Sequence, residues 1–232
     1  MVKAALFDID GTLVDTVDLH AAAWREAFAH FGKQVDYDEV RSQIGKGGDK
    51  LIPTFLEEDE VDRFGAEVEE YRSQLYKREY LPLAKPFPGA RDLVRRVHAA
   101  GIRVALASSC KKDELQHYID LVDIEAALDA AVTADDIEES KPAPDVFEAA
   151  LDRLAADARD SVAVGDSPFD AIAAGRAGVR TIGLLCGGFP RTTLLEAGCI
   201  ALYEGPEDLL LRFDASPFVD GAAAGLETSA QP

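Results

Sequence analysis

Positive charge is scarce in this chain of 232 residues. It carries 24 Lys and Arg against 43 Asp and Glu, which gives a formal net charge of −19 at pH 7. Such an excess of negative charge argues against a nucleic acid or an anionic membrane as a partner. It does not exclude an anionic small substrate, because a bound metal and one or two lysines can reverse the local field.

Cysteines and long apolar runs are also scarce. The three cysteines, Cys110, Cys186 and Cys199, are an odd number without metal-type spacing, so we expect reduced and mostly buried thiols. No apolar run approaches the length that spans a bilayer. The chain starts directly with a predicted strand and shows no charged-then-apolar leader, so we expect a cytoplasmic protein. We expect a monomer or a small homo-oligomer.

Short apolar runs alternate with amphipathic helical patterns over most of the chain. This order predicts βαβ units, and therefore an α/β fold with a doubly wound parallel sheet. Ligands in such sheets bind at the carboxyl ends of the strands. The predicted strands cover residues 2–7, 103–107, 130–133, 161–164 and 180–185, and the helices lie at about 89–100, 111–121, 144–156 and 168–176.

One segment, residues 16–82, interrupts the alternation. It contains two apolar stripes at helical spacing, one from Val17 to Phe31 and one from Val61 to Leu75. We therefore expect a helical domain inserted between the first strand and the rest of the sheet. The predicted division is a core of residues 1–15 and 83–213, an inserted domain of residues 16–82, and a poorly packed tail of residues 214–232.

Two carboxylates follow the first predicted strand. Asp8 and Asp10 are two residues apart, so on a strand their side chains point to the same face. Carboxylates that close repel each other, which favours a bound cation or one raised pKa, and both are features of catalytic sites. The plain alternative is a strand-end turn with polar caps.

Two further segments place polar side chains after predicted strands. In the first, Ser109 suits a helix N-cap, whereas Ser108 could hold a phosphate oxygen. In the second, Lys141 precedes Pro142 and Pro144, which stiffen the backbone and lead into a helix. A lysine on a rigid loop can neutralise a phosphate or a carboxylate, although a lone lysine is commonly a solvated surface charge.

The last of these segments contains Asp166 and Asp170. Ser167 and Pro168 between them predict a helix start, which also gives Asp170 a capping role. Asp166 is not needed for capping. Mg²⁺ prefers carboxylate oxygens and water, so Asp166 together with Asp8 and the backbone carbonyl of Asp10 would form a magnesium site.

The four segments together resemble the haloacid dehalogenase superfamily of hydrolases over nearly the full length of the chain. The resemblance implies a Rossmann-like core with a mobile helical cap of the first type over the site. It also implies roles for the quoted residues: Asp8 as nucleophile, Asp10 as general acid and base, Ser108 and Lys141 as phosphate ligands, Mg²⁺ at Asp8, Asp10 and Asp166, and Asp170 as support for the metal site.

Asp10 decides between the activities of this superfamily. Its dehalogenases need no proton donor and typically lack the second aspartate, so its presence favours phosphoryl transfer. We therefore expect a phosphatase that acts on a small phosphorylated metabolite, of the phosphoglycolate or sugar phosphate type. The alternative is a sugar phosphate mutase like β-phosphoglucomutase. A binding or scaffold protein that has lost catalysis is disfavoured, because the aspartates and Lys141 are all present.

The expected cap offers four candidate substrate-binding residues. His20 lies at a distance from Asp15 and Thr16 that resembles the mutase, although it also borders the apolar stripe of the first cap helix. Lys46, Gly47 and Lys50 lie in a glycine-rich loop that lacks the arginine with which the mutase grips a distal phosphate. This loop resembles that of phosphatases related to phosphoglycolate phosphatase, or carries only solvated charges.

Overall fold

A six-stranded parallel sheet forms the centre of the protein. The computed structural model describes residues 1–219. The order of the strands is β5-β4-β1-β6-β7-β8, and every neighbouring pair is parallel. This confirms the predicted α/β fold. The strands are β1 (Ala4–Phe7), β4 (Arg103–Ala107), β5 (Ala130–Val132), β6 (Ser161–Gly165), β7 (Arg180–Leu184) and β8 (Cys199–Tyr203).

Helices cover both faces of the sheet, which is why β1 is apolar at every position. Ala5 and Phe7 of β1 belong to one apolar cluster, and Ala4 and Leu6 belong to another on the opposite face. The first cluster includes residues of α6, α7 and α11, and the second residues of α8 and α9. The helices of the core are α6 (Ala90–Ala99), α7 (Lys112–Val122), α8 (Asp145–Leu154), α9 (Pro168–Arg176), α10 (Arg191–Glu196) and α11 (Pro206–Leu211).

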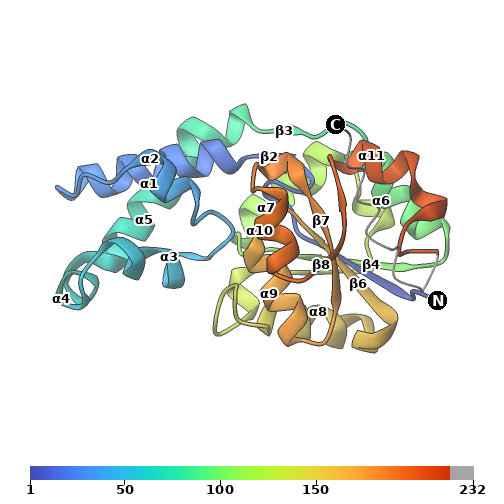
Figure 1. Cartoon of the computed structure of the whole chain (residues 1–232). Coiled ribbons are helices and arrows are strands. Elements are labelled where there is room, and N and C mark those ends of the chain that lie inside the picture. The colour runs from blue at the N-terminus through green and yellow to red at the C-terminus, as the bar shows by residue number, and fades with distance from the viewer. Residues whose placement is uncertain (220–232) are drawn as a thin grey trace, which may run out of the picture.

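The helices between β1 and α6 form a separate layer beside the carboxyl ends of the strands (Figure 1). They enclose their own apolar cluster, in which Trp24 and Phe28 pack against Leu51 and Val68. These cap helices are α1 (Val17–His30), α2 (Tyr37–Arg41), α3 (Gly48–Phe55), α4 (Glu58–Glu60) and α5 (Ala66–Leu75), with π-helical turns at Val61–Gly65 and Tyr76–Tyr80.

Two short strands carry the chain into and out of the cap. β2 (Val14–Asp15) pairs antiparallel with β3 (Lys85–Pro86), where the sequence predicts only a linker. The paired strands hold the two connections side by side. Among residues 1–219, no helix combines the length and the apolar character that crossing a membrane requires.

The sequence predictions are wrong or incomplete at the carboxyl-terminal end. β8 and the helices α10 and α11 were not predicted. The expectation of poor packing from Asp214 onward is wrong for the described residues: Ser216 and Phe218 are buried, and Phe218 stacks on Phe213 and contacts Phe7 of β1. Residues 220–232 of the expected tail lie outside the described part of the chain.

Candidate active site

Two neighbouring strands place an aspartate at the same edge of the sheet. β1 ends at Phe7 and β6 at Gly165, and because the strands are parallel, Asp8 and Asp166 emerge side by side. Asp170, in the first turn of α9, joins them: one oxygen of each of the three carboxylates lies within 4.8 Å of the other two. All three side chains are buried. The convergence that the sequence predicts for Asp8 and Asp166 is present, whereas the carboxylate of Asp10 is not part of this cluster.

Lys141 neutralises part of this cluster from the loop before α8. Its Nζ lies 2.6 Å from Asp8 Oδ1 and 2.7 Å from Asp170 Oδ1, and it donates to the carbonyl oxygen of Ala107 at 2.8 Å. Burial lowers the pKa of Lys141, but the two carboxylates outweigh this effect and raise it above its usual value. Lys141 is therefore a buried ammonium ion, not the solvated surface charge of the plain alternative.

One lysine does not balance three buried carboxylates. Burial raises the pKa of Asp8 to about 7 despite Lys141, and it raises the pKa of Asp166 well above the usual value, with Asp170 and Asp8 adding repulsion. The hydroxyl of Thr12 lies within hydrogen-bond distance of both Asp8 Oδ2 (3.1 Å) and Asp166 Oδ1 (3.0 Å). A divalent cation on Asp8 and Asp166 would remove this excess charge, so these oxygen donors fit Mg²⁺.

Both carboxylate oxygens of Asp170 have partners within the protein. Its Oδ2 accepts hydrogen bonds from the backbone N–H and the hydroxyl of Ser167 in a capping box at the start of α9, and its Oδ1 faces Lys141. Both expected features, the helix start at Ser167 and the capping role of Asp170, are present. Asp170 thus orients Lys141 and leaves Asp8 and Asp166 as the available cation ligands.

Asp10 faces the cap. Its Oδ1 accepts hydrogen bonds from Thr16 Oγ1 at 2.7 Å and from His20 Nε2 at 2.9 Å. Arg72 Nη2 of α5 lies within hydrogen-bond distance of His20 Nδ1. Because an ionised carboxylate can only accept, His20 Nε2 carries the proton in the contact with Asp10. Burial raises the pKa of Asp10, but the contacts with His20 and Thr16 outweigh it and hold the pKa below its usual value.

The two serines after β4 have different surroundings. Ser108 is buried, and its Oγ accepts from the backbone N–H of Cys110 at 3.1 Å. The expected N-cap role of Ser109 is wrong, since α7 begins at Lys112 and its N-cap is Lys111. Ser109 instead lines the cavity described below, and its buried hydroxyl has no hydrogen-bond partner among residues 1–219. A phosphate contact through Ser108 stays a prediction.

The cap loop contacts the core through Gly47 and Asp49. The backbone N–H of Gly47 donates to Ser140 Oγ at 3.0 Å, and the Asp49 carboxylate accepts from the backbone N–H and the hydroxyl of Ser140. Lys46 lies over the ring of Phe169, and burial lowers its pKa. The substrate contact expected for Lys50 is not supported. Lys50 does not line the cavity, and it pairs with Glu139 at 3.4 Å.

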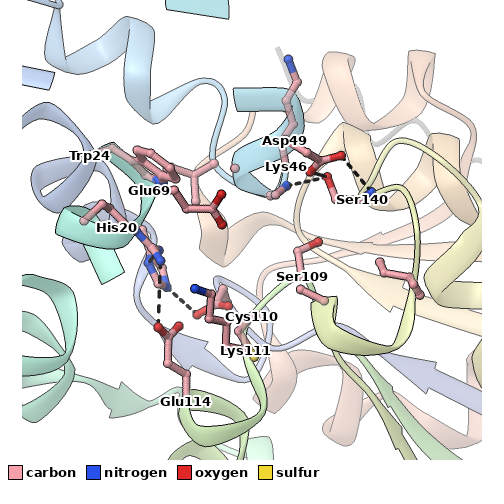
Figure 2. Close-up of a pocket in the computed structure, with 18 of the residues that line it drawn as sticks. His20, Trp24, Lys46, Asp49, Glu69, Ser109, Cys110, Lys111, Glu114 and Ser140 are labelled. Atoms are coloured by element: carbon pink, nitrogen blue, oxygen red, sulfur yellow. Dashed lines mark hydrogen bonds and ion pairs between the residues drawn. The ribbon is translucent and has the colours of Figure 1, made fainter. Parts of the chain in front are cut away.

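A cavity of about 230 Å³ lies between the cap and the core. Asp8 and Asp10 line it from the core, and His20, Lys46 and Gly47 line it from the cap. Figure 2 shows the cap side chains His20, Trp24 and Glu69 on one side of this space and Ser109, Lys111 and Glu114 on the other. The lining residues that were not predicted as site residues include Trp24, Glu69, Arg72 and Glu114.

The sequence held a weak signal for some of these residues. Trp24 falls within the apolar stripe predicted from Val17 to Phe31, and it lies in the cap cluster while also lining the cavity. Glu114 lies within one turn of the start of α7, after a strand whose end was expected to carry site residues. Nothing in the sequence indicated that Arg72, from a different helix, reaches the same space.

Comparisons with known proteins agree with this geometry. A sequence profile described as "Haloacid dehalogenase-like hydrolase" matches residues 5–184. The chain belongs to this family. It is 31% identical over 214 residues to the "Phosphorylated carbohydrates phosphatase" of Thermotoga maritima, a match that covers 90% of this chain and 97% of that protein. The resemblance found in the sequence is thereby confirmed.

Two further relatives of this haloacid dehalogenase-like hydrolase are informative. The "Validoxylamine A 7'-phosphate phosphatase" of Streptomyces hygroscopicus subsp. limoneus is 27% identical over 187 residues, 79% of this chain and 86% of that protein. The crystal structure of a hydrolase from Pseudomonas syringae superposes with a TM-score of 0.86 at 29% identity and covers 92% of this chain and 98% of that one. The similarity to solved structures thus includes both the core and the cap.

Proposed function

We propose that this protein is a Mg²⁺-dependent phosphatase that hydrolyses the phosphate monoester of a small metabolite. The arrangement of Asp8 carries the proposal: a buried carboxylate paired with Lys141, next to Asp166, at the wall of a cavity that the cap covers. The names of two relatives, one a phosphatase of phosphorylated carbohydrates, support it. A cavity of about 230 Å³ suits a small substrate and not a macromolecule.

The proposed reaction proceeds in two displacements at phosphorus. Asp8 attacks the phosphorus atom, the bond to the leaving oxygen breaks, and an aspartyl-phosphate forms. Asp10 gives its proton to the leaving oxygen. A water molecule then attacks the same phosphorus, Asp10 takes the proton of that water, and phosphate leaves Asp8. Bound Mg²⁺ would supply positive charge that stabilises the phosphoryl oxygens.

The residues around the two aspartates suit these roles. Lys141 holds Asp8 Oδ1 in place and provides a positive charge beside the transferring group. His20 and Thr16 hold Asp10 in its ionised form, which is the form that accepts the proton of water in the second step. The first step needs the proton on Asp10, so we infer that the contact with His20 changes between the two steps.

A mutase is the second candidate, and the charges of the cavity disfavour it. A mutase must bind a second phosphate, which requires cationic side chains that have no other partner. Three cationic side chains among residues 1–219 line the cavity, and only Lys111 has no side-chain partner. Arg72 contacts His20 and the ring of Trp24, and Lys46 contacts Gln43 and Phe169. Asp49 adds a negative charge on the cap loop. A cytoplasmic location and a monomer or small homo-oligomer complete the proposal.

The test is hydrolysis of an aryl phosphate with and without Mg²⁺. We expect Mg²⁺-dependent release of the phenol, and its loss in Asp8→Asn, with Asp152→Asn on the exposed side of α8 as the matched control. Activity that survives Asp8→Asn would disprove the mechanism. A hexose phosphate with a bisphosphate primer then separates the two candidates, since isomerisation with little free phosphate would show a mutase.

A further inference from the structure

Glu114 is a buried carboxylate that the proposed chemistry does not use. It lies in the first turn of α7, 1% of its surface is exposed, and it lines the same cavity as Asp8. Its Oε1 has no hydrogen-bond partner among the described residues, and the nearest cation, Arg72 Nη1, is 4.0 Å away. A buried carboxylate oxygen without a donor is unfavourable, which indicates that a ligand supplies the donor.

An unused donor accompanies this unused acceptor. Arg72 also lines the cavity, and its Nε is buried without an acceptor among residues 1–219. The other end of Arg72 is occupied, because Nη2 donates to His20 Nδ1. Figure 2 shows Glu114 directed from the core toward the cap side chains at this end of the cavity. One unused acceptor and one unused donor therefore lie on two side chains that line the same cavity and approach each other to 4.0 Å, between Arg72 Nη1 and Glu114 Oε1.

A hydroxyl group is the ligand that satisfies both atoms. It donates to Glu114 Oε1 and accepts from Arg72 Nε, whereas a carboxylate or phosphate can only accept and would be repelled by Glu114. The side chain of Glu69, also at the wall, has no ion pair or hydrogen bond among the described residues and adds a second negative charge. Among the lining cations of the described residues, only Lys111 has no partner. This part of the cavity therefore has two carboxylates, Glu69 and Glu114, and one unpaired cation.

We infer that Glu114 and Arg72 form a subsite for a hydroxyl of the leaving group, so that the protein selects monophosphates of neutral polyhydroxy compounds, such as sugars, over phosphates whose leaving group is anionic. This inference rests on the proposed phosphatase function and makes Glu114 a specificity-determining residue. A site built around a hydroxyl rejects an analogue that lacks it, because the buried polar atoms then stay unpaired.

The test compares substrates within each variant. We expect the native protein to prefer a hexose 6-phosphate to phosphoglycolate, in kcat/KM, by about tenfold or more. Glu114→Gln and Glu114→Ala should lower this preference by about tenfold. The matched control is Glu148→Gln, an exposed residue of α8. A preference that is the same in Glu114→Ala and the native protein would overturn the inference.

Removing hydroxyls from the substrate gives the second arm. Across monodeoxy hexose 6-phosphates, one position should reduce kcat/KM in the native protein and have little effect in Glu114→Ala, since the partner of that hydroxyl is gone. If Glu114 only positioned Arg72 and thereby Asp10, all substrates would lose activity equally.

Hydrolysis of an aryl phosphate is the reference. If the native protein hydrolyses it but shows no preference among the other substrates, the inference fails and the proposed function stands. If it hydrolyses none of them, the proposed function fails.

Discussion

Asp8 Oδ1 and Lys141 Nζ lie 2.6 Å apart, and both side chains are almost completely buried. Removing one partner of a buried ion pair leaves the other charge without compensation. Lys141→Met should therefore lower the free energy of unfolding by about 3 kcal/mol, as measured by urea denaturation in the absence of metal. It should also abolish hydrolysis, because Asp8 loses the group that orients it.

Two variants test this prediction. Lys3→Met removes an exposed lysine that pairs with Asp160 and should change the free energy of unfolding by less than about 1 kcal/mol. In the double variant Lys141→Met/Asp8→Asn the loss should be smaller than in Lys141→Met, since one uncompensated carboxylate is removed. Equal stability of Lys141→Met and the native protein would contradict the prediction.

Mg²⁺ should stabilise the protein more at high pH than at low pH. The folded-state pKa of Asp8, about 7, is higher than its usual value, and that of Asp166 is raised in the same direction. A raised carboxyl pKa contributes stability at low pH, and this contribution is lost as the pH rises through the folded-state value. The ionised carboxylates should therefore destabilise the metal-free protein as the pH rises from about 5 to about 8. This range includes the folded-state pKa of Asp8, about 7.

The melting temperature with and without Mg²⁺, at each pH, is the measurement. The increase that Mg²⁺ causes should be larger at the higher pH, because ionised carboxylates bind it more tightly. In Asp166→Asn the increase in melting temperature that Mg²⁺ causes should be small at both pH values. A Mg²⁺ effect that does not depend on pH would show that these carboxylates are not its ligands.

The sequence predicts the core of the site because that part depends on local rules. A polar residue directly after a buried strand lies at the carboxyl edge, and strands β1 and β6 are neighbours in the sheet, so Asp8 and Asp166 had to meet. The helix start at Ser167 follows equally local chemistry. The α/β fold was predicted from the alternation of strands and helices, and the family from the resemblance of the four polar segments.

The other half of the site depends on how the cap packs against the core, which no local pattern gives. Arg72 reaches His20 from another helix across the stacked ring of Tyr76. Lys50 pairs with Glu139 and does not line the cavity, because the hydrogen bond between Ser140 and Asp49 fixes the position of the loop. Phe218 is buried because it stacks on Phe213, and a single aromatic residue in a small-residue segment did not indicate this contact.

Gly187→Ala should damage the acidic cluster while the fold persists. A Cβ at Gly187 would lie 1.7 Å from Asp166 Oδ2, so the carboxylate must move out of its place. We expect most of the Mg²⁺-dependent increase in melting temperature and most of the activity to be lost. Gly175→Ala is the matched control, since a Cβ there meets no atom within 4 Å and alanine favours the helix by about 0.5–1 kcal/mol. Full activity in Gly187→Ala would contradict the placement of Asp166.

The contact of His20 with Asp10 should appear in the pH dependence of the rate. His20 Nε2 donates to Asp10 at 2.9 Å and helps to hold the pKa of Asp10 below its usual value, so Asp10 stays ionised in mildly acidic solution. In His20→Ala that pKa rises, and the loss of kcat on the acidic side should begin at a higher pH than in the native protein. The maximal kcat should fall by about tenfold to a hundredfold, because Asp10 loses a contact that positions it and the whole contribution of a positioned acid–base group is about 100-fold or more. The measurement is kcat against pH for an aryl phosphate, with His98→Ala, an exposed residue of α6, as the control. If kcat falls at the same acidic pH in His20→Ala as in the native protein, His20 does not set the pKa of Asp10.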